Sequence, residues 1–377
     1  MPDVLISADS IRSPEMRHEV PVVVPDPFLY IERNGSRHVV VSPFEVERIQ
    51  GQNGLQPHPY EQFGWDELVA QGLPLEEVEL QTYVRAVREL GVESAVVPPT
   101  FPVELADRLR ADGIEISPDR RSFVERRRVK TQAEVDGIKR AQRGAEAGMD
   151  AARDLFRRAE EKGGSLTVAG EPLTCERVKL AVQQAFTERD LVADEFIVSH
   201  GAQTAIGHEL GHGEIKAGEP IVLDLWPRDR ASSCYSDMTR TFVIGEPPEE
   251  LAKYHRLVHE ALERALAAVK PGIPGRDVYV LVSEFFHEHG FKTGLHKQEG
   301  EVLEDGFHHG LGHGVGLEVH EEPWLSRYPG ELVTGDVITL EPGLYRAGWG
   351  GCRLEDIVLV TEDGGELLTQ YPYDLQP

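Results

Sequence analysis

Apolar residues follow two different spacings in the first part of the chain, and together these spacings predict an alternation of helices and strands. In residues 75–91 the apolar positions recur at intervals of three and four, which is typical of an amphipathic helix, and Gly91 ends the segment. Residues 20–25 and 38–42 are short β-branched runs bounded by Pro, Asn and Gly, so we expect strands there. A helix followed by a strand is expected again over residues 101–119. This order predicts a three-layer α/β unit.

A short basic sequence, ERRR at residues 125–128, separates this unit from the remainder of the chain. Charged stretches of this kind are typical of exposed connectors between domains. We therefore expect two domains, formed by residues 1–125 and 126–377. A chain of 377 residues is long enough for two domains of unequal size, each with its own hydrophobic core.

Two helices are expected at the start of the second domain. Thr131 followed three residues later by Glu134 forms a capping box, which predicts a helix that runs to the break at residues 162–164. A second helix is expected from Thr174 to Arg189.

From residue 195 onward the chain consists mainly of strand-like runs separated by turn residues. These runs are residues 195–201, 219–226, 235–245, 336–345 and 352–361. Helical spacing returns at residues 251–270 and 277–290. The second domain is therefore expected to be of the α+β class.

Charge and composition exclude several classes of partner. The chain has 39 Lys and Arg against 65 Asp and Glu, a formal charge of -26, which disfavours nucleic acid and anionic membranes. The first residues lack the apolar core of a signal peptide, and no segment approaches the roughly 18 apolar residues of a membrane helix. We therefore expect a cytoplasmic protein. Three cysteines do not suggest a disulfide framework, and we expect them to be buried apolar residues.

Residues 208–212 read HELGH, which matches the H-E-x-x-H pattern of zinc proteases. In those enzymes a continuous helix places both histidines on one face. Here glycines interrupt the surrounding sequence, and each opposes a helix by roughly 1 kcal/mol. The longer metzincin pattern also fails, because Ile215 and Gly218 stand where it requires Gly and His. We therefore reject a zinc-binding helix and expect His212 to be a surface residue.

Acidic residues occur inside the strand-like runs, where carboxylates are unusual. They are Asp224, Asp237, Glu341 and Glu355. A buried carboxylate costs several kcal/mol unless it is paired or binds a metal. A network of buried ion pairs is the alternative, but these motifs contain no matching set of basic residues.

A histidine cluster lies between the two pairs of carboxylates. It contains His308, His309, His313 and His320, and glycines flank His313. Two Asp, two Glu and one His make an oxygen-rich site that favours Mn, Co or a similar divalent ion. Five such residues suffice for two metals, which at about 3.5 to 4 Å apart can hold a bridging hydroxide as the nucleophile.

Several of these motifs resemble those of the pita-bread metallopeptidases, the family of methionine aminopeptidase, aminopeptidase P and prolidase. The motifs are SDMTRTF, HHGLGHGVGLEVHEEP, TLEPGLY and CRLED. The resemblance covers residues 127–370. The upstream α/β unit resembles the N-terminal domain shared by aminopeptidase P, prolidase and creatinase. The resemblance implies a pita-bread domain at residues 126–377, after a creatinase-like domain at residues 1–125.

The resemblance also implies a role for individual residues. The metal ligands would be Asp224, Asp237, His313, Glu341 and Glu355. Glu341 would also be the general base, and His208 and His320 would contact the scissile amide and stabilise the tetrahedral intermediate. His309 matches a further pocket histidine. By spacing, Arg353 and Tyr235 each lie two residues before a ligand carboxylate, so we expect both to be partners of the ligands.

The segment between the two Asp ligands departs from the family pattern. Twelve residues separate Asp224 from Asp237, two more than the family usually has, and Leu225-Trp226 replaces a glycine-containing sequence. Because side chains alternate along a strand, two extra residues leave both carboxylates on one face. We expect the longer loop at residues 226–233 to affect substrate preference rather than chemistry.

The resemblance implies hydrolysis of peptide bonds that precede proline, in small peptides with proline second. Two divalent ions are expected, Mn or Co first and Zn as an alternative. The N-terminal domain argues against methionine aminopeptidase, and the short length favours a prolidase, which cleaves Xaa-Pro dipeptides. An aminopeptidase P acting on longer peptides is the alternative; a creatinase-like hydrolase and an inactive binding module are further ones. The resemblance also implies a homodimer.

Overall fold

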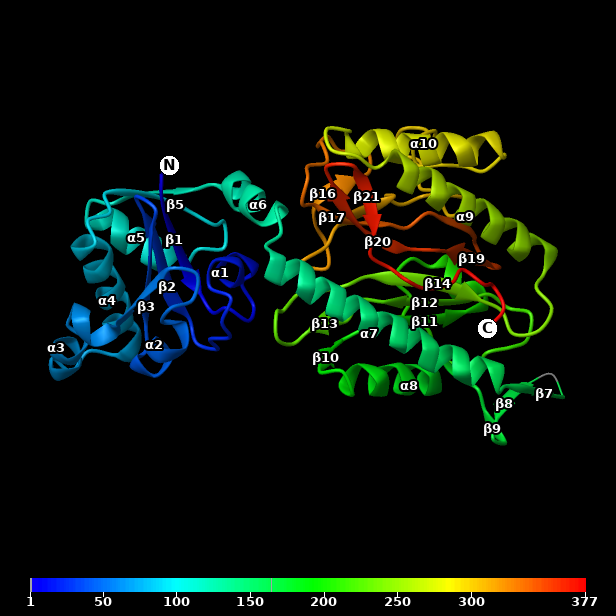
Figure 1. Cartoon of the computed structure of the whole chain (residues 1–377), viewed down its shortest axis with the longest axis horizontal. Coiled ribbons are helices and arrows are strands. Elements are labelled where there is room, and N and C mark those ends of the chain that lie inside the picture. The colour runs from blue at the N-terminus through cyan, green and yellow to red at the C-terminus, as the bar shows by residue number, and fades with distance from the viewer. Residues whose placement is uncertain (1, 164) are drawn as a thin grey trace. The chain divides into compact units, whose positions relative to one another are not determined.

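The computed structural model describes residues 2–163 and 165–377 of the chain (Figure 1). The chain divides into two compact units, one that ends at Arg127 and one that runs from Arg128 to Pro377. The boundary expected near residue 125 lies within helix α6 (Arg120–Arg128), close to this division.

The first unit is built on a six-stranded mixed sheet in the order β4-β3-β2-β1-β5-β6. The strands are β1 (Asp3–Ala8), β2 (Phe28–Arg33), β3 (Ser36–Val41), β4 (Leu55–Pro59), β5 (Ser94–Val97) and β6 (Glu115–Pro118). The helices are α1 (Pro14–Glu19), α2 (Pro43–Ile49), α3 (Trp65–Ala70), α4 (Leu75–Glu89) and α5 (Val103–Ala111), with a 3-10 turn η1 (Tyr60–Phe63).

Both faces of this sheet are buried. Leu5 and Leu29 pack into one core with residues of α4 and α5, whereas Val4 and Ile6 pack into a second core with residues of α1 and α2. Alternate residues of a strand point to opposite faces, so helices must cover both sides. The expected three-layer α/β class is confirmed.

The strand prediction for residues 20–25 is wrong, and strands β1 and β2 were not predicted. Pro21 and Pro25 lack the amide donors that a ladder requires. The segment instead forms a loop. The hydroxyl of Ser10 donates to the carbonyl of Val22 at 2.6 Å and accepts from the amide of Val24 at 2.7 Å.

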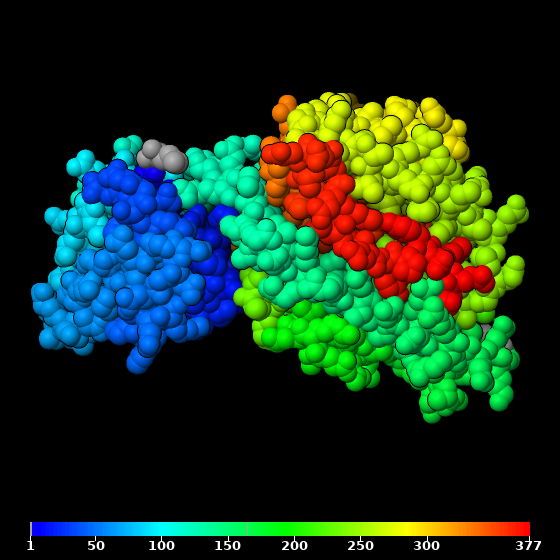
Figure 2. Space-filling model, in the orientation of Figure 1, coloured from blue at the N-terminus to red at the C-terminus, as the bar shows by residue number. Residues whose placement is uncertain are grey.

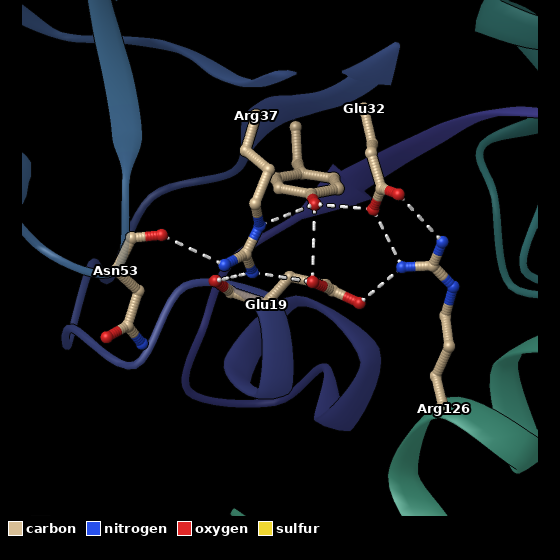
Figure 3. A network of polar contacts seen from close by, with 6 residues as sticks. Glu19, Glu32, Arg37, Asn53 and Arg126 are labelled. Carbon is tan, nitrogen blue, oxygen red and sulfur yellow. Dashed lines mark hydrogen bonds and ion pairs between the residues drawn. The ribbon is translucent and has the colours of Figure 1, made fainter. Parts of the chain in front are cut away.

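The basic stretch at residues 125–128 is not an exposed connector, which corrects the sequence interpretation. Arg127 and Arg128 are each only 7% exposed. Arg126 donates to Glu19 and Glu32, both at 2.8 Å, in the polar network of the first unit (Figure 3). Charge alone did not reveal burial, because arginine can be buried when carboxylates meet it.

The second unit begins with the two helices that the sequence predicts. Helix α7 (Gln132–Arg157) has the capping box of Thr131 and Glu134, and α8 (Cys175–Thr187) is capped by Thr174. Helix α7 ends before the predicted break because the chain enters a small sheet of β7 (Glu160–Lys162), β8 (Ser165–Val168) and β9 (Glu171–Pro172).

Strands occupy the middle of the second unit, between two helical layers (Figure 1). One sheet has the order β11-β12-β14, another β16-β15-β17-β20-β21, and β18 pairs with β19. Their bounds are β11 (Ile197–His200), β12 (Ile221–Leu225), β14 (Met238–Phe242), β15 (Gly312–Gly314), β16 (Glu321–Leu325), β17 (Val337–Leu340), β18 (Gly343–Arg346), β19 (Gly350–Arg353), β20 (Asp356–Thr361) and β21 (Gly364–Leu367). Short pieces are β10 (Leu191–Val192), β13 (Arg228–Asp229) and the 3-10 turn η2 (Gly201–Ala205).

Each helical layer packs on its own part of the strands. Helices α7 and α8 share a core with β11, β12 and β14, whereas α9 (Glu249–Ala268) and α10 (Gly275–Glu288) share one with β17, β19 and β20. The C-terminal segment lies along α7 on the surface (Figure 2), where Tyr371 bonds to Asp150 and Asp374 pairs with Arg153.

Two predicted strands are interrupted at an acidic residue. The run at 336–345 divides into β17 and β18, and Glu341 lies in the break; the run at 352–361 divides into β19 and β20, and Glu355 lies in that break. A carboxylate in a break can turn toward a site instead of following the alternation of a ladder. Within the described residues, no helix is long and apolar enough to cross a membrane. All three cysteines are buried and unbridged.

Candidate metal centre

Most of the predicted site residues line one cavity of about 700 Å³ in the second unit. The lining includes Asp224, Asp237, His313, Glu341, Glu355, His208, His309, His320 and Arg353. Tyr235 is the one predicted site residue outside that lining. Residues that are more than a hundred positions apart in sequence therefore meet at a single place.

Asp224 and Asp237 reach the cavity from neighbouring strands. Leu225 and Met238 form the last ladder pair of β12 and β14, and Asp224 lies opposite Thr239. Asp237 comes directly before β14. Asp237 lies two positions before Thr239, the ladder partner of Asp224, and this even offset is consistent with both carboxylates lining the cavity.

His313 is held by a tightly packed backbone. A Cβ at Gly312 would stand 2.0 Å from the carbonyl oxygen of Thr339, and one at Gly314 would stand 2.3 Å from that of Glu322. Only glycine permits this approach. The Nδ1 atom of His313 lies 3.0 Å from the carbonyl of Gly314, which leaves Nε2 to face the carboxylates.

Three side chains offer ligand atoms close enough to share one ion. Oxygen atoms of Asp237 and Glu355 and a ring nitrogen of His313 all lie within 4.8 Å of one another, and all three residues are buried. The Nε2 atom of His313 lies 3.7 Å from Oδ2 of Asp237 and 3.7 Å from Oε1 of Glu341. This geometry gathers oxygen and imidazole donors around one point.

The carboxylates are electrostatically unfavourable as they stand. Burial, and then the charges of neighbouring carboxylates, raise the pKa of Asp237 and of Glu355 well above their ordinary values. Burial raises the pKa of Glu341 to about 8, and burial lowers the pKa of His313 to about 3. Each shift opposes a charge on the side chain, so bound cations would stabilise the ionised carboxylates.

Unsatisfied oxygen atoms also fit a metal site. The Oδ1 atoms of Asp224 and Asp237 are buried and lack a hydrogen-bond partner within the part of the chain that the structure describes. Buried oxygen atoms of this kind are costly unless a ligand meets them. The residues present therefore fit divalent cations.

One guanidinium approaches the carboxylates. Arg353 donates to Oδ2 of Asp224 at 2.5 Å and to the hydroxyl of Tyr345 at 2.9 Å. Thr239 donates to Oε2 of Glu355 at 2.7 Å. Among the described residues, no Lys or Arg pairs with the other three carboxylates, which does not fit a network of ion pairs.

Four further histidines line the cavity, namely His208, His308, His309 and His320. The Nε2 atom of His309 lies 2.9 Å from the hydroxyl of Tyr345. His208 is exposed. Burial is the largest cause that lowers the pKa of His320 and of His309, and the nearby His208 contributes to both shifts. An imidazole N–H group at the edge of a cavity can donate a hydrogen bond to an oxygen atom that enters it.

The segment HELGH is not helical, as the surrounding glycines predict. Gly211 has φ +83°, and a Cβ there would stand 1.8 Å from the carbonyl oxygen of Val198. Leu210 accepts a hydrogen bond from the amide of Val198 at 3.0 Å, so the segment runs beside β11. His212 is exposed and faces Glu209 at 3.4 Å, outside the cavity lining.

Tyr235 does not reach the cavity because strand β14 begins only at Met238. Its amide donates to the carbonyl of Gly316 at 2.7 Å, and Arg228 lies over its ring at 5.9 Å. Tyr235 instead forms an isolated bridge with Arg228, outside β14. Arg353 does meet one of the predicted ligand carboxylates, but that carboxylate is Asp224, and β19 ends before Glu355.

Sequence reasoning missed several cavity residues. The sequence motifs predicted no role for His308, but it lines the cavity, and its ring centroid lies 4.9 Å from that of Tyr345. Trp226 and Glu195 also line it. The hairpin of β18 and β19 brings Tyr345 near Arg353, and a prediction of that hairpin could have found this contact.

The longer loop at residues 226–233 is folded rather than open. Asp229 accepts from the amide of Ser232 at 2.8 Å and from Arg140 at 2.8 Å, and β13 pairs with β10. Trp226 is the loop residue in the cavity lining.

A model of metallopeptidase family M24 matches residues 136–362 of the chain. The chain belongs to this family. Family M24 implies divalent metal ions, in agreement with the donor set described above. The membership makes the chain a metallopeptidase of the pita-bread class.

Proteins of similar sequence agree with this assignment. The chain is 30% identical to an Xaa-Pro dipeptidase of Pyrococcus horikoshii over 299 residues, 79% of this chain and 77% of that protein. It is 37% identical to an Xaa-Pro dipeptidase of Pyrococcus furiosus over 185 residues, which span about half of each protein, 48% and 49%.

Solved structures share the fold over the whole chain. The prolidase of Pyrococcus furiosus matches with a TM-score of 0.75 and 24% identity, covering 99% of this chain and 97% of that one. An Xaa-Pro dipeptidase of Bacillus anthracis matches with a TM-score of 0.78 and 23% identity, covering 100% and 94%. Both likenesses concern the two-unit architecture.

Proposed function

We propose that this metallopeptidase hydrolyses the bond before proline in Xaa-Pro dipeptides, as a prolidase. The observation that carries the proposal is the cavity in which four carboxylates and His313 meet four further histidines. The relative from Pyrococcus horikoshii, which is named an Xaa-Pro dipeptidase, supports the choice of substrate.

The proposed ligands of two divalent cations are Asp224, Asp237, His313, Glu341 and Glu355. Oxygen-rich donors favour Mn or Co, and Zn also suits carboxylate and imidazole ligands. Bound cations would lower the pKa of water and polarise the scissile carbonyl. Arg353 holds Asp224 in place through its 2.5 Å hydrogen bond.

The chain itself supplies the proton transfers and the oxyanion contacts. Glu341 accepts a proton from the attacking water and returns it to the proline nitrogen as that nitrogen leaves. His208 and His320 donate hydrogen bonds to the carbonyl oxygen as negative charge develops there.

A comparison of two substrates tests the proposal. Purified protein is given Ala-Pro or a longer peptide that begins Ala-Pro, each with Mn, Co or Zn, and released proline or peptide is measured. Preference for the dipeptide supports a prolidase. Preference for the longer peptide means an aminopeptidase P instead.

Chelation supplies the control. Loss of turnover with a chelator, and recovery with added Mn or Co, supports metal dependence. Turnover that persists without metal points to a creatinase-like reaction. Protein that holds no metal and cleaves no Xaa-Pro peptide would be a binding module, and the proposal would fail.

We also propose that the protein works as a homodimer in the cytoplasm. Resemblance to pita-bread peptidases with a creatinase-like N-terminal domain supports the dimer, and the acidic composition is compatible with an aqueous compartment. Light scattering on the purified chain tests the first point, and cell fractionation tests the second.

A further inference from the structure

The residues that line the cavity form two chemically different groups. One group comes from β11, β12 and the segment that follows η2, and it includes Glu195, Ile197, Leu210 and Trp226. The other group comes from residues 308–320 and includes His308, His309, His313 and His320. Apart from Asp224 and His208, the first group is apolar with one carboxylate, Glu195, whereas the second is rich in imidazole.

Trp226 lies immediately beside the proposed metal ligands. Leu225 and Met238 form the last ladder pair of β12 and β14, so Trp226 and Asp237 are the next positions on the two strands. Trp226 is partly buried and packs against the core beneath the sheet, which fixes its ring. Its exposed face is therefore a rigid apolar surface next to the reacting bond.

Glu195 belongs to the same group of lining residues as Trp226, which together form one wall of the cavity. It precedes Ile197 by two residues, and Ile197 pairs with Asp224. Glu195 lies just before β11, which begins at Ile197, and two residues of chain span at most about 7 Å, so the backbone of Glu195 lies within roughly that distance of Ile197. Glu195 is exposed and takes part in no hydrogen bond or ion pair among the residues that the structure describes.

This wall suits a side chain with an aliphatic stem and a cationic end. The stems of Lys and Arg lie on apolar surfaces while their charged ends reach a polar partner. The ring of Trp226 would also attract a nearby cation. The α-ammonium of a dipeptide lies close to the scissile carbonyl and therefore does not extend to Glu195. The charged group at the end of a four-carbon stem extends outward, toward that carboxylate.

We propose that Glu195 and Trp226 form the subsite for the Xaa side chain, and that this subsite favours Lys or Arg. The inference rests on the proposed hydrolysis of Xaa-Pro dipeptides. The proline end of the substrate then lies on the other side of the scissile bond, toward the histidines of the second group. His308 is suited to meet it, since its Nδ1 atom lacks a hydrogen-bond partner among the described residues.

The test compares Lys-Pro, Met-Pro and Glu-Pro as substrates of the full chain with Mn. Met resembles Lys in length but carries no charge. We expect kcat/KM to fall in the order Lys-Pro, Met-Pro, Glu-Pro. Glu195→Gln is expected to lower kcat/KM for Lys-Pro by about two- to fivefold, the range of an exposed ion pair, and to leave Met-Pro unchanged.

A neighbouring residue provides the matched control. Asp194→Asn removes the same charge one position away, outside the cavity lining, and should leave the ratio of Lys-Pro to Met-Pro unchanged. Trp226→Leu keeps the wall apolar but removes the aromatic face, so it should also lower the ratio.

Three results overturn the inference. The first is an unchanged ratio of Lys-Pro to Met-Pro in Glu195→Gln. The second is an equal loss of activity on both substrates, which would assign Glu195 to the α-ammonium. The third is an effect of Asp194→Asn as strong as that of Glu195→Gln. These outcomes differ from failure of the proposed function, in which the unmodified protein cleaves none of the three dipeptides.

Discussion

Two polar clusters in this protein use the same kinds of residue but balance their charges differently. In the first unit, Glu19 and Glu32 meet Arg37 and Arg126, and the hydroxyl of Tyr30 bonds to both carboxylates (Figure 3). In the second unit, four carboxylates meet one guanidinium. The first cluster is neutral as built, whereas the second needs cations from outside.

The acid strengths of the carboxylates follow this difference. The hydrogen bond from Arg126 is the largest cause that lowers the pKa of Glu32. Burial and like charges raise the pKa of Asp237 instead. A balanced cluster stabilises the fold, while an unbalanced cluster marks a binding site.

The largest effect is expected when one carboxylate is removed from the unbalanced cluster. Asp237→Asn should lower the hydrolysis of Ala-Pro by about a thousandfold or more, because losing a metal ligand removes several kcal/mol of transition-state stabilisation. Metal content, measured by atomic emission, should fall with it. In the presence of a chelator the variant should melt no lower than the unmodified protein, since repulsion among the carboxylates is reduced. A large loss of stability in chelator would show that Asp237 has a structural role.

A smaller loss is expected from residues at the cavity that do not hold metal. His208→Ala should lower kcat for Ala-Pro by about a hundred- to a thousandfold, the range for one lost oxyanion donor, with metal content unchanged. His212→Ala, four residues away and outside the cavity lining, should stay within about twofold. Metal loss in His208→Ala would instead favour a zinc-binding role for HELGH.

Removing a cation from the balanced cluster should destabilise the first unit. Arg126→Met leaves Glu19 and Glu32 short of a partner, and we expect a loss of about 1–3 kcal/mol, because the guanidinium is partly exposed. Hydrogen exchange of the β1 and β2 amides measures this loss in the unit concerned. Arg121→Met, on the exposed side of the same helix, should cost less than about 0.5 kcal/mol. Equal effects would show that the network contributes nothing beyond surface charge.

The smallest effect is a pH dependence of the same unit. The folded-state pKa of Glu32 is lowered, so its contribution to stability is present above the ordinary value of 4.5 and is lost as pH falls through the folded-state pKa. Between about pH 5 and 3 the β1 and β2 amides should therefore lose more protection in the unmodified chain than in Glu32→Gln. The opposite order would mean that Glu32 is not ionised in the folded state.

Much of the site could be predicted from the sequence because its chemistry conflicts with its surroundings. Asp224 and Asp237 were conspicuous as charges within apolar runs, and the glycines beside His313 indicated a crowded backbone. The capping box at Thr131 fixed the start of α7 because the signal is local.

Features that depend on where strands end could not be predicted in the same way. Tyr235 was misplaced because the start of β14 is set by pairing with β12, and nothing local marks it. Burial of Arg127 and Arg128 depends on partners far along the chain, such as Asp336, which accepts from Arg128 at 2.6 Å. Glu195 and Trp226 carried no chemical signal until the cavity placed them together.

The spread of the proposed ligands along the chain has a consequence for folding. Asp224 lies in β12 and Glu355 lies between β19 and β20, and their approach requires closure of a long loop. Asp224 and Asp237 come from paired strands, but the complete set of ligands cannot form early from neighbouring residues, in contrast to a zinc finger, whose metal nucleates the fold. Metal should therefore bind late, after the strands have assembled. It should stabilise the completed domain rather than nucleate its folding.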